Sequence, residues 1–329
     1  MNLVYKLYSK LNKNKLLGNT IELLLNTLYF PIKLCLRTKK GLLNKEKKYY
    51  ISICAIFKNE GHNLKEWIEY HKLVGIDHIY LYNNFSEDNY LEILTSYIED
   101  GFVTLTEWPY KHSQIAAYED CLVKHKCETF WLTFIDLDEF ICPKYEYNIK
   151  DWIKNYEGFP AVTMYWQMFG TCGKMKPDYS KLVIEQYTTS WEKIDGIGKY
   201  ILCTEERFSP SKIYPHHIFV NFKIGAFKIK LPMINENKRF IFFPLLYNSP
   251  IKNTIQLNHY FSKSYLEYYN KINKGDVFSN SHEQISKVRY LNITRFSLIL
   301  FFSCPIKISI LFLVCSCELE KTSPLFILL

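Results

Sequence analysis

The stretch Phe130–Phe140 reads FWLTFIDLDEF and places three carboxylates directly after a strand-forming run. Its first six residues are apolar except for one threonine, and aromatic and branched side chains of this kind favour a buried strand. Ligands of open α/β sheets bind at the carboxyl ends of the strands, which is where Asp136, Asp138 and Glu139 stand. The stretch therefore predicts a sheet with a polar site at one of its edges.

The chain before this stretch alternates strand-like and helical runs. Tyr50–Phe57 (YISICAIF) predicts a buried strand. Asn63–Val74 has apolar residues at helical spacing, with Asn63 as the expected N-cap and Gly75 as the end of the helix. Further strands are expected at His78–Tyr82 and Phe102–Thr106, and further helices at Tyr90–Ile98 and Ser113–His125. This alternation implies right-handed βαβ units, and we predict an α/β fold with a mainly parallel, Rossmann-like sheet over about residues 49–145.

The pattern becomes irregular after residue 161. Strands without long helices between them are expected at Val162–Phe169, Val183–Thr188 and Phe219–Phe227, and a helix at Tyr265–Ile272. We therefore expect one domain over residues 49–295, with a regular first half and an irregular second half.

Residues 1–48 form a basic lead-in to this domain. Residues 16–36 are apolar but interrupted by polar and charged residues, and basic residues follow at Arg37, Lys39 and Lys40. This pattern favours a helix that lies in a membrane interface over one that spans a bilayer. No early apolar core with a small-residue cleavage site is visible near the N-terminus, so we expect a cytoplasmic protein that associates peripherally with an anionic membrane surface.

The composition changes abruptly after about residue 295, from Lys, Asn and Tyr to Leu, Ile, Phe and Cys. Residues 297–317 are long and apolar enough for a membrane segment. A membrane-associated tail and a reading-frame error near the end of the gene would both produce this change. Residues 296–329 are therefore treated as a separate hydrophobic C-terminal tail.

The overall composition excludes several classes of protein. With 48% hydrophobic residues among 329, the chain can bury a large core, which excludes general disorder. The 41 basic residues against 33 acidic ones give a charge of +8, which suits anionic partners. The ten cysteines are scattered without a CxxC pair, which favours reduced thiols over zinc sites or a disulfide framework. Basic residues are not interleaved with aromatic ones on any one predicted face, so a nucleic-acid binder is disfavoured.

The acidic run after the strand suggests a hard divalent cation. Adjacent carboxylates repel one another unless a cation neutralises them, and Mn²⁺ or Mg²⁺ held by one or two carboxylates usually completes its shell with phosphate oxygens. A solvated acidic turn is the structural alternative. A phosphoaspartyl enzyme is disfavoured because Phe140 occupies the position where that chemistry needs Thr or Val. A two-metal nuclease would need further acidic clusters, and none stands out.

The turn after the first strand carries Lys58, Asn59 and Glu60, whose side chains face the same crevice as the aspartates. Neither a GxGxxG sequence after the first strand nor a phosphate-binding P-loop is present. A nucleotide bound here would therefore be held by metal and side chains.

Several motifs over about residues 50–275 occur in one order. They are Lys58-Asn59-Glu60, Glu66–His71, Gly75–His78, Tyr82–Asp88, Gln114 with Ala117-Tyr118, Asp136–Phe140, Phe169-Gly170, His216-His217 and Asn258–Tyr260. In these motifs the chain resembles glycosyltransferase family 92 and the neighbouring family-2-like enzymes. The resemblance implies a GT-A fold with an acceptor-binding second half, a divalent metal (Mn²⁺ or Mg²⁺), a nucleotide-sugar donor and inversion at the anomeric carbon.

The resemblance also implies roles for individual residues. Asp136 would contact the donor ribose, or the metal through water, and Asp138 would ligate the metal directly with Glu139 beside it. His259 would be a further metal ligand. The residues expected to bind the donor are Lys58, Glu60, Asp88 and Gln114, with Lys199 or His217 facing the diphosphate.

The sequence leaves two questions open: the identity of the general base and the effect of Asn83. Inversion needs a general base, for which Glu185, Glu192 and Asp195 in the irregular half are candidates, with Glu185 and Asp195 preferred. Asn83 stands where the family tends to have Asp, which puts a base or ribose contact in doubt.

The function expected from these observations is metal-dependent, inverting transfer of a hexose, UDP-galactose being the first donor expected, to a glycan or lipid-linked saccharide. The alternative is a non-catalytic, membrane-associated scaffold that keeps a degenerate GT-A fold. Asn83 and the unusual C-terminal tail support this alternative, whereas the intact Asp136 and Asp138 oppose it.

Overall fold

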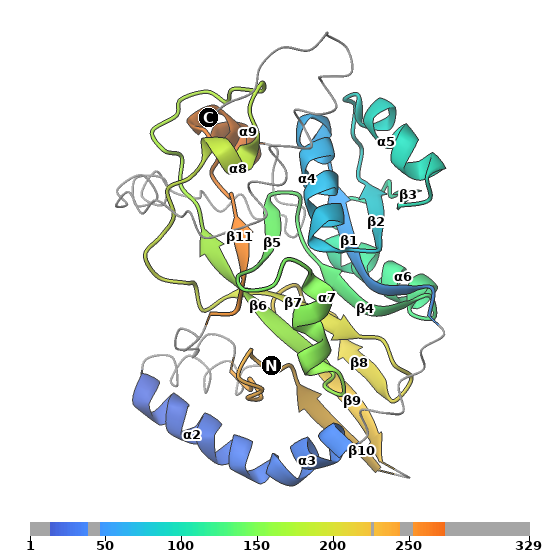
Figure 1. Cartoon of the computed structure of the whole chain (residues 1–329), viewed down its shortest axis with the longest axis vertical. Helices are drawn as coiled ribbons and strands as arrows, with labels where there is room; N and C mark the ends of the chain where they lie inside the picture. Colours follow the sequence, from blue (N-terminus) through green and yellow to red (C-terminus); the bar gives the residue numbers. More distant parts are fainter. Residues whose placement is uncertain (1–13, 39–46, 225–226, 244–252, 274–329) are drawn as a thin grey trace, which may run out of the picture.

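The computed structural model describes residues 14–38, 47–224, 227–243 and 253–273. Its strands form an eight-stranded sheet of order β3-β2-β1-β4-β7-β6-β11-β5 and a three-stranded sheet of order β10-β9-β8 (Figure 1). Two helices near the N-terminus, α2 (Lys15–Leu28) and α3 (Phe30–Thr38), lie at the end of the molecule that carries the smaller sheet.

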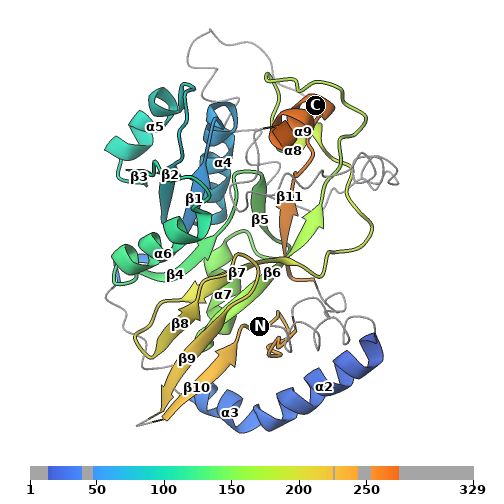
Figure 2. The ribbon, with the colours of Figure 1, turned by 180° about the vertical axis from the view of Figure 1, so that it is seen from behind.

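The first half of the domain is the predicted series of βαβ units. Its elements are β1 (Tyr49–Phe57), α4 (Gly61–Val74), β2 (His78–Asn83), α5 (Tyr90–Glu99), β3 (Val103–Glu107), α6 (Gln114–His125) and β4 (Thr129–Phe134). The four strands pair in the order β3-β2-β1-β4, and every pair is parallel. Helix α4 covers one face of this sheet and α6 covers the other, as Figures 1 and 2 show from opposite sides. The predicted α/β fold is therefore confirmed, with boundaries within two residues of those expected.

One detail of this half differs from the expectation. Helix α4 begins at Gly61, and its N-cap is Glu60 rather than Asn63. The helix thus begins three residues earlier than the capping pattern suggests, and the Asn63 side chain lies within its first turn, where it donates a hydrogen bond to Glu60 Oε2 at 2.7 Å. The end of the helix is as predicted, with Gly75 in a left-handed conformation at φ 100°.

The second half extends the same sheet with strands of mixed direction. Its elements are β5 (Glu139–Pro143), α7 (Ile149–Ile153), β6 (Ala161–Met168), α8 (Val183–Gln186), β7 (Gly198–Cys203), β8 (Phe208–Lys212), β9 (Phe219–Ile224), β10 (Phe227–Pro232), β11 (Ile255–His259) and α9 (Tyr265–Asn273). Strand β7 is antiparallel to both β4 and β6, whereas β11 runs parallel to β6 and antiparallel to β5. Strand β11 thereby brings residues 255–259 close to the turn that follows the carboxyl end of β4.

Two predicted strands of this half were wrong. Residues 183–188 do not form a strand: Val183–Gln186 is the short helix α8. The half-buried carboxylate of Glu66 accepts hydrogen bonds from Val183 N at 2.7 Å and Ile184 N at 3.1 Å, and this distant partner overrides the strand preference of branched residues. Residues 219–227 are not one strand either, because β9 and β10 pair in an antiparallel ladder with Phe227 opposite Ile224.

The N-terminal apolar run forms two helices that are fixed to the domain. Helix α2 ends at Leu28, and α3 begins beside it with Pro31 in its first turn, a position where proline is tolerated. The ring of Tyr29 packs edge-on against Phe240 and Phe242, at centroid distances of 5.9 and 5.1 Å. Within the described ranges no helix is long and apolar enough to cross a membrane, and the predicted segment 297–317 lies outside these ranges.

A close approach between β6 and β7 sets the position of the residue that follows Gly198. A Cβ atom at Gly198 would lie 1.9 Å from the carbonyl oxygen of Met164. We predict that Gly198→Ala lowers the free energy of unfolding by about 3 kcal/mol or more, because backbone must move to admit the methyl group. Urea unfolding is the measurement. The control is Gly101→Ala, at φ 72° with nothing within 4 Å, for which about 1–2 kcal/mol is expected, and equal losses would contradict the prediction.

The anchor of α8 gives the protein a pH-dependent stability. Burial raises the pKa of Glu66 to about 7 from 4.5, while the two amides of α8 oppose the rise. A raised carboxyl pKa means that this contribution to stability is complete below pH 4.5 and is lost as the pH rises through about 7. We predict that Glu66→Gln flattens the fall in unfolding free energy between these pH values by up to about 3 kcal/mol. Glu92→Gln, on the exposed side of α5, should leave the slope unchanged; an unaltered slope in Glu66→Gln would refute the assignment.

Candidate active site

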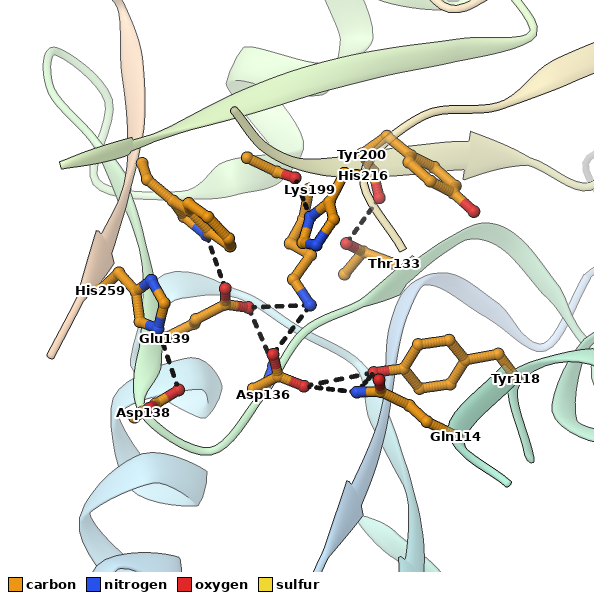
Figure 3. Close-up of polar contacts among 12 residues, drawn as sticks. Gln114, Tyr118, Thr133, Asp136, Asp138, Glu139, Lys199, Tyr200, His216 and His259 are labelled. Atoms are coloured by element: carbon orange, nitrogen blue, oxygen red, sulfur yellow. Dashed lines mark hydrogen bonds and ion pairs between the residues drawn. The ribbon is translucent and has the colours of Figure 1, made fainter. Parts of the chain in front are cut away.

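The acidic run lies at the carboxyl end of β4, as the sequence predicted. Asp136 and Asp138 occupy the turn between β4 and β5, and Glu139 is the first residue of β5. Figure 3 shows that side chains from α6, β7 and β11 converge on this turn. Residues as far apart in the sequence as Gln114 and His259 thereby meet at the carboxyl end of β4.

The carboxylate of Asp136 is held from two sides. Its Oδ1 accepts hydrogen bonds from Gln114 Nε2 at 3.0 Å and from the Tyr118 hydroxyl at 3.3 Å. Its Oδ2 accepts a hydrogen bond from Lys199 Nζ at 2.9 Å. Three donors from α6 and β7 therefore fix the orientation of this carboxylate, and the structure brings together the predicted residues Gln114, Asp136 and Lys199.

Glu139 is fully buried behind Asp136. Its Oε1 accepts a hydrogen bond from the indole of Trp166 at 2.6 Å, and its Oε2 accepts one from the backbone amide of Asp136 at 2.9 Å. Burial raises the pKa of Glu139 to about 7, although Lys199, 3.7 Å away, opposes this rise. Burial also tends to lower the pKa of Lys199, but the attraction of Asp136 and Glu139 prevails and raises it to about 12. Lys199 is therefore charged and forms ion pairs with both carboxylates.

Asp138 lies on the other side of the turn and faces β11. Its Oδ2 is paired with the ammonium group of Lys271 on α9, and its Oδ1 lies 3.5 Å from His259 Nε2. The backbone carbonyl of Asp138 accepts a hydrogen bond from Tyr260 N at 2.8 Å, which ties the turn to β11. Burial tends to raise the pKa of Asp138, but Lys271 and His259 outweigh it and hold the pKa well below its usual range. Asp138 is thus an ionised carboxylate beside an imidazole.

These two side chains fit a divalent cation. Asp138 Oδ1 is buried, faces His259 Nε2 at 3.5 Å, and forms no hydrogen bond with any part of the chain that the structure describes. A carboxylate oxygen and an imidazole nitrogen are suitable ligands for Mn²⁺. In the described ranges no group of three or more His, Cys, Asp or Glu side chains is arranged to hold a metal, so phosphate or water oxygens would complete the shell. When bound, such an ion would stabilise the negative charge of a departing phosphate.

Three predicted donor-binding residues lie near the start of α4. Glu60 is half-buried and lies 3.8 Å from Lys263 Nζ. Asp88 Oδ2 accepts a hydrogen bond from Gly61 N at 2.7 Å and so helps to cap α4, while its Oδ1 is buried without a partner among the described residues. Lys58 is exposed, with Nζ 5.9 Å from the centre of the Phe85 ring. These residues line the neighbouring turns rather than contacting Asp136.

The structure brings His216 to the site rather than His217. His217 Nε2 lies 3.0 Å from the carbonyl oxygen of Ile241, and its ring packs against Phe219, away from the carboxylates. The ring centroids of His216 and Trp166 lie 5.0 Å apart, and His216 Nδ1 lies 3.0 Å from the carbonyl oxygen of Gly198. Burial, aided by the positive charge of Lys199, lowers the pKa of His216 to about 4, so this imidazole is neutral.

The base candidates differ in their surroundings. Glu185 is exposed, and its Oε2 accepts a hydrogen bond from Leu182 N at 3.2 Å within α8. Glu192 is also exposed. Asp195 is half-buried, and its amide donates to the carbonyl of Trp166 at 2.9 Å. Its Oδ1 accepts a hydrogen bond from Ile197 N at 3.2 Å. Because the Trp166 indole binds Glu139, the backbone of Asp195 is linked through Trp166 to the carboxylate cluster.

Lys263 and Lys271 were not anticipated from the sequence. Lys271 is 133 residues from Asp138, and neither lysine belongs to a local motif that marks it as part of a site. The only hint in the sequence is that both lysines follow the predicted residue His259 within twelve residues. Only the return of β11 and α9 to the carboxyl end of β4 places their charges here.

Asn83, the departure noted in the sequence, has a local structural role. Its Oδ1 accepts a hydrogen bond from Ser86 N at 3.0 Å. Its Nδ2 donates to Glu107 Oε2 at 2.7 Å and to the Tyr90 hydroxyl at 3.0 Å. A carboxylate at this position would face that of Glu107, so the amide suits its surroundings in this chain.

The ion cluster around Lys199 yields a stability prediction. We expect Lys199→Met to lower the free energy of unfolding by about 3–5 kcal/mol, because it leaves the buried Glu139 and the half-buried Asp136 without their cation. Adding Glu139→Gln to this variant should recover part of the loss, since one of the uncompensated charges is then removed. Urea unfolding measures both, with Lys212→Met as the exposed control, expected to stay within about 0.5 kcal/mol of the parent. Independent, additive effects of the two changes would contradict the cluster.

The sequence profile of glycosyltransferase family 92 matches residues 47–242. A glycosyltransferase family 92 protein of Ricinus communis is 33% identical over 114 residues, which cover 34% of this chain and 21% of that protein. The beta-1,4-galactosyltransferase galt-1 of Caenorhabditis elegans is 32% identical over 127 residues, which cover 34% of this chain and 30% of that protein. The matches thus span less than a third of either relative's length.

Similarity to solved structures is low. Residues 1–349 of TarS from S. aureus, in complex with UDP, align over 39% of this chain and 38% of that chain, with 16% identity and a TM-score of 0.30. Glucosyl-3-phosphoglycerate synthase from Mycobacterium tuberculosis aligns over 50% of this chain and 58% of that chain, with 16% identity and a TM-score of 0.29. Scores of this size carry no inference about this chain.

The family profile covers more than half of the chain and includes β1 to β10 together with the acidic turn. The resemblance drawn from the sequence motifs is thereby confirmed, and this chain belongs to glycosyltransferase family 92.

Proposed function

We propose that this protein is a metal-dependent, inverting glycosyltransferase that moves a hexose from a UDP-sugar to a saccharide, either a glycan or a lipid-linked one. The observation that supports this most is the pairing of an ionised, buried Asp138 with His259 at the carboxyl end of β4, in a chain of glycosyltransferase family 92. The ion assigned to this pair is Mn²⁺ or Mg²⁺.

Galactose is the first sugar to test. Two relatives carry galactosyltransferase names: galt-1 of Caenorhabditis elegans and the galactan beta-1,4-galactosyltransferase GALS3 of Arabidopsis thaliana. The latter is 29% identical over 133 residues, which cover 36% of this chain and 26% of that protein. These names support UDP-galactose as the donor without deciding the acceptor.

The donor would meet a site that is already organised. Asp136 is held by Gln114, Tyr118 and Lys199, so it can accept a donor hydroxyl without reorienting. The ammonium groups of Lys263 and Lys271 lie on the Asp138 side of the turn, where they would attract a diphosphate.

Inversion requires removal of a proton from the acceptor hydroxyl. We assign this role to Asp195, because its amide is hydrogen-bonded to Trp166, whose indole binds Glu139, whereas Glu185 is exposed. The Asp195 carboxylate takes the proton, and the acceptor oxygen forms a bond to the anomeric carbon. The bond from that carbon to the diphosphate breaks, and its electron pair leaves with UDP.

The test measures Mn²⁺ binding by calorimetry and transfer or release of galactose from UDP-galactose. We predict that Asp138→Asn weakens Mn²⁺ binding by about tenfold or more and lowers turnover by about a hundredfold or more. Asp178→Asn is the matched control. Among the described residues the Asp178 carboxylate, 44% exposed, contacts only Ser180 and Lys181, so this change should alter neither quantity.

A second variant separates the metal from the base. Asp195→Asn should retain Mn²⁺ and UDP-galactose binding and lose transfer by about a hundredfold or more. Loss of Mn²⁺ binding in Asp195→Asn would contradict its role as the base. If the parent chain binds neither Mn²⁺ nor any UDP-sugar, the non-catalytic scaffold is the better description.

A further inference from the structure

The outward face of α2 is apolar over residues 16–28, apart from two threonines. Every residue of this helix from 16 to 28 that is exposed is leucine or threonine. The exposed fractions are 79% for Leu16, 42% for Leu17, 58% for Leu23, 60% for Leu24 and 72% for Leu28. These positions recur at helical spacing, so they form one stripe.

The two threonines in the stripe expose no free donor. The hydroxyl of Thr20 donates to the carbonyl of Leu16 at 2.9 Å, and that of Thr27 donates to the carbonyl of Leu23 at 3.0 Å. Each therefore bonds back to its own helix, an arrangement that suits surroundings without water.

The polar side chains of Glu22 and Asn26 face inward instead. Asn26 Oδ1 accepts a hydrogen bond from Phe240 N at 2.8 Å, and its Nδ2 donates to Phe240 O at 2.9 Å. Glu22 Oε1 accepts one from Phe242 N at 3.2 Å, and burial raises the pKa of this carboxyl. A surface helix in water normally has the opposite arrangement, with its apolar stripe toward the core. These three hydrogen bonds prevent the leucine stripe from turning inward.

Helix α3 continues the apolar surface. Phe30 is 53% exposed and Leu34 is 45% exposed, while Leu36 is completely buried against the domain. The carbonyl oxygen of Leu36 approaches Gly158 so closely that a Cβ atom there would lie 2.8 Å from it. The exposed apolar side chains of α3 are therefore fixed in place as well.

A basic ladder lies beside these helices. Lys223 on β9 stands opposite Lys228 on β10, and Lys230 is two residues further along the same strand. All three are exposed, and within the described ranges none forms an ion pair with a carboxylate. Like charges directly opposite one another destabilise a ladder unless an anion compensates them. Figures 1 and 2 both place this hairpin next to α3, at the same end of the molecule.

We propose that α2 and α3, together with the β9–β10 hairpin, form a docking surface for an anionic lipid bilayer. The leucine stripe enters the boundary between headgroups and acyl chains, and the lysines face the acidic headgroups. Helix α2 has 14 residues and a length of about 21 Å, which is too short to span a bilayer and suits a helix lying in the interface. This surface is independent of the catalytic proposal.

The experiment is flotation of the full chain with two kinds of vesicle, phosphatidylcholine alone and phosphatidylcholine with about one third phosphatidylserine. Leu24→Gln/Leu28→Gln should reduce binding by about tenfold or more, because two leucine side chains no longer leave water. The matched control is Leu91→Gln/Val123→Gln, two exposed apolar residues of α5 and α6, which should bind as the parent does. Thermal unfolding of each variant verifies that it is folded.

The charge contribution is tested separately. Lys223→Gln/Lys228→Gln should weaken binding to the phosphatidylserine vesicles several-fold and leave binding to phosphatidylcholine unchanged, and added salt should act in the same way. Equal binding by the parent and Leu24→Gln/Leu28→Gln would overturn the proposal, since another part of the chain would then hold the membrane. A parent that ignores both vesicles and forms a dimer dissociated by the leucine changes would also overturn it, because a second copy would then cover this face.

Discussion

The site depends on one buried interaction, that of Lys199 with Asp136 and Glu139. An ammonium group or a carboxylate that is buried without its partner is costly, so β4, β5 and β7 must keep their relative positions to within a residue. A shift of β7 by one residue would turn Lys199 to the other face of the sheet and leave the two carboxylates without a cation. Pairing of Lys199 with Met164 in the β6–β7 ladder, and the close approach at Gly198, hold that register. The register of the sheet therefore determines the geometry of the site.

The Asp138 side of the site depends on β11, a strand that lies more than 100 residues after Asp138 in the sequence. Strand β11 lies between β6 and β5, where His259 stands opposite Glu139, and the amide of Tyr260 holds the turn at Asp138. Asp138 thus has fixed backbone and a fixed imidazole neighbour, while its remaining partner is a lysine with a half-exposed side chain. The low pKa of Asp138 keeps its carboxylate charged at neutral pH. In the proposed reaction this carboxylate would exchange the Lys271 ammonium group for a divalent cation.

The sequence predicted what local patterns determine. The βαβ half follows from short apolar runs and helical spacing, and the carboxylates after β4 follow from the position of ligands at strand ends. It failed where a distant contact decides the local structure. Residues 183–188 have the branched residues of a strand, but Glu66, 117 residues earlier, caps them as a helix. Of the two adjacent histidines, His216 contacts Gly198 of β7 and His217 contacts Ile241, and no spacing in the sequence reveals which of them lies at the site.

The departure at Asn83 bears on whether this chain is a degenerate member of its family. A lost carboxylate would matter if the negative charge had left this corner of the sheet. Glu107 stands opposite Asn83 in the β2–β3 ladder, with its carboxylate 2.7 Å from the Asn83 amide. The charge is therefore present one strand away, and the amide at position 83 is the group that can donate to it. The substitution is compensated by its neighbour, so it does not by itself argue for loss of activity.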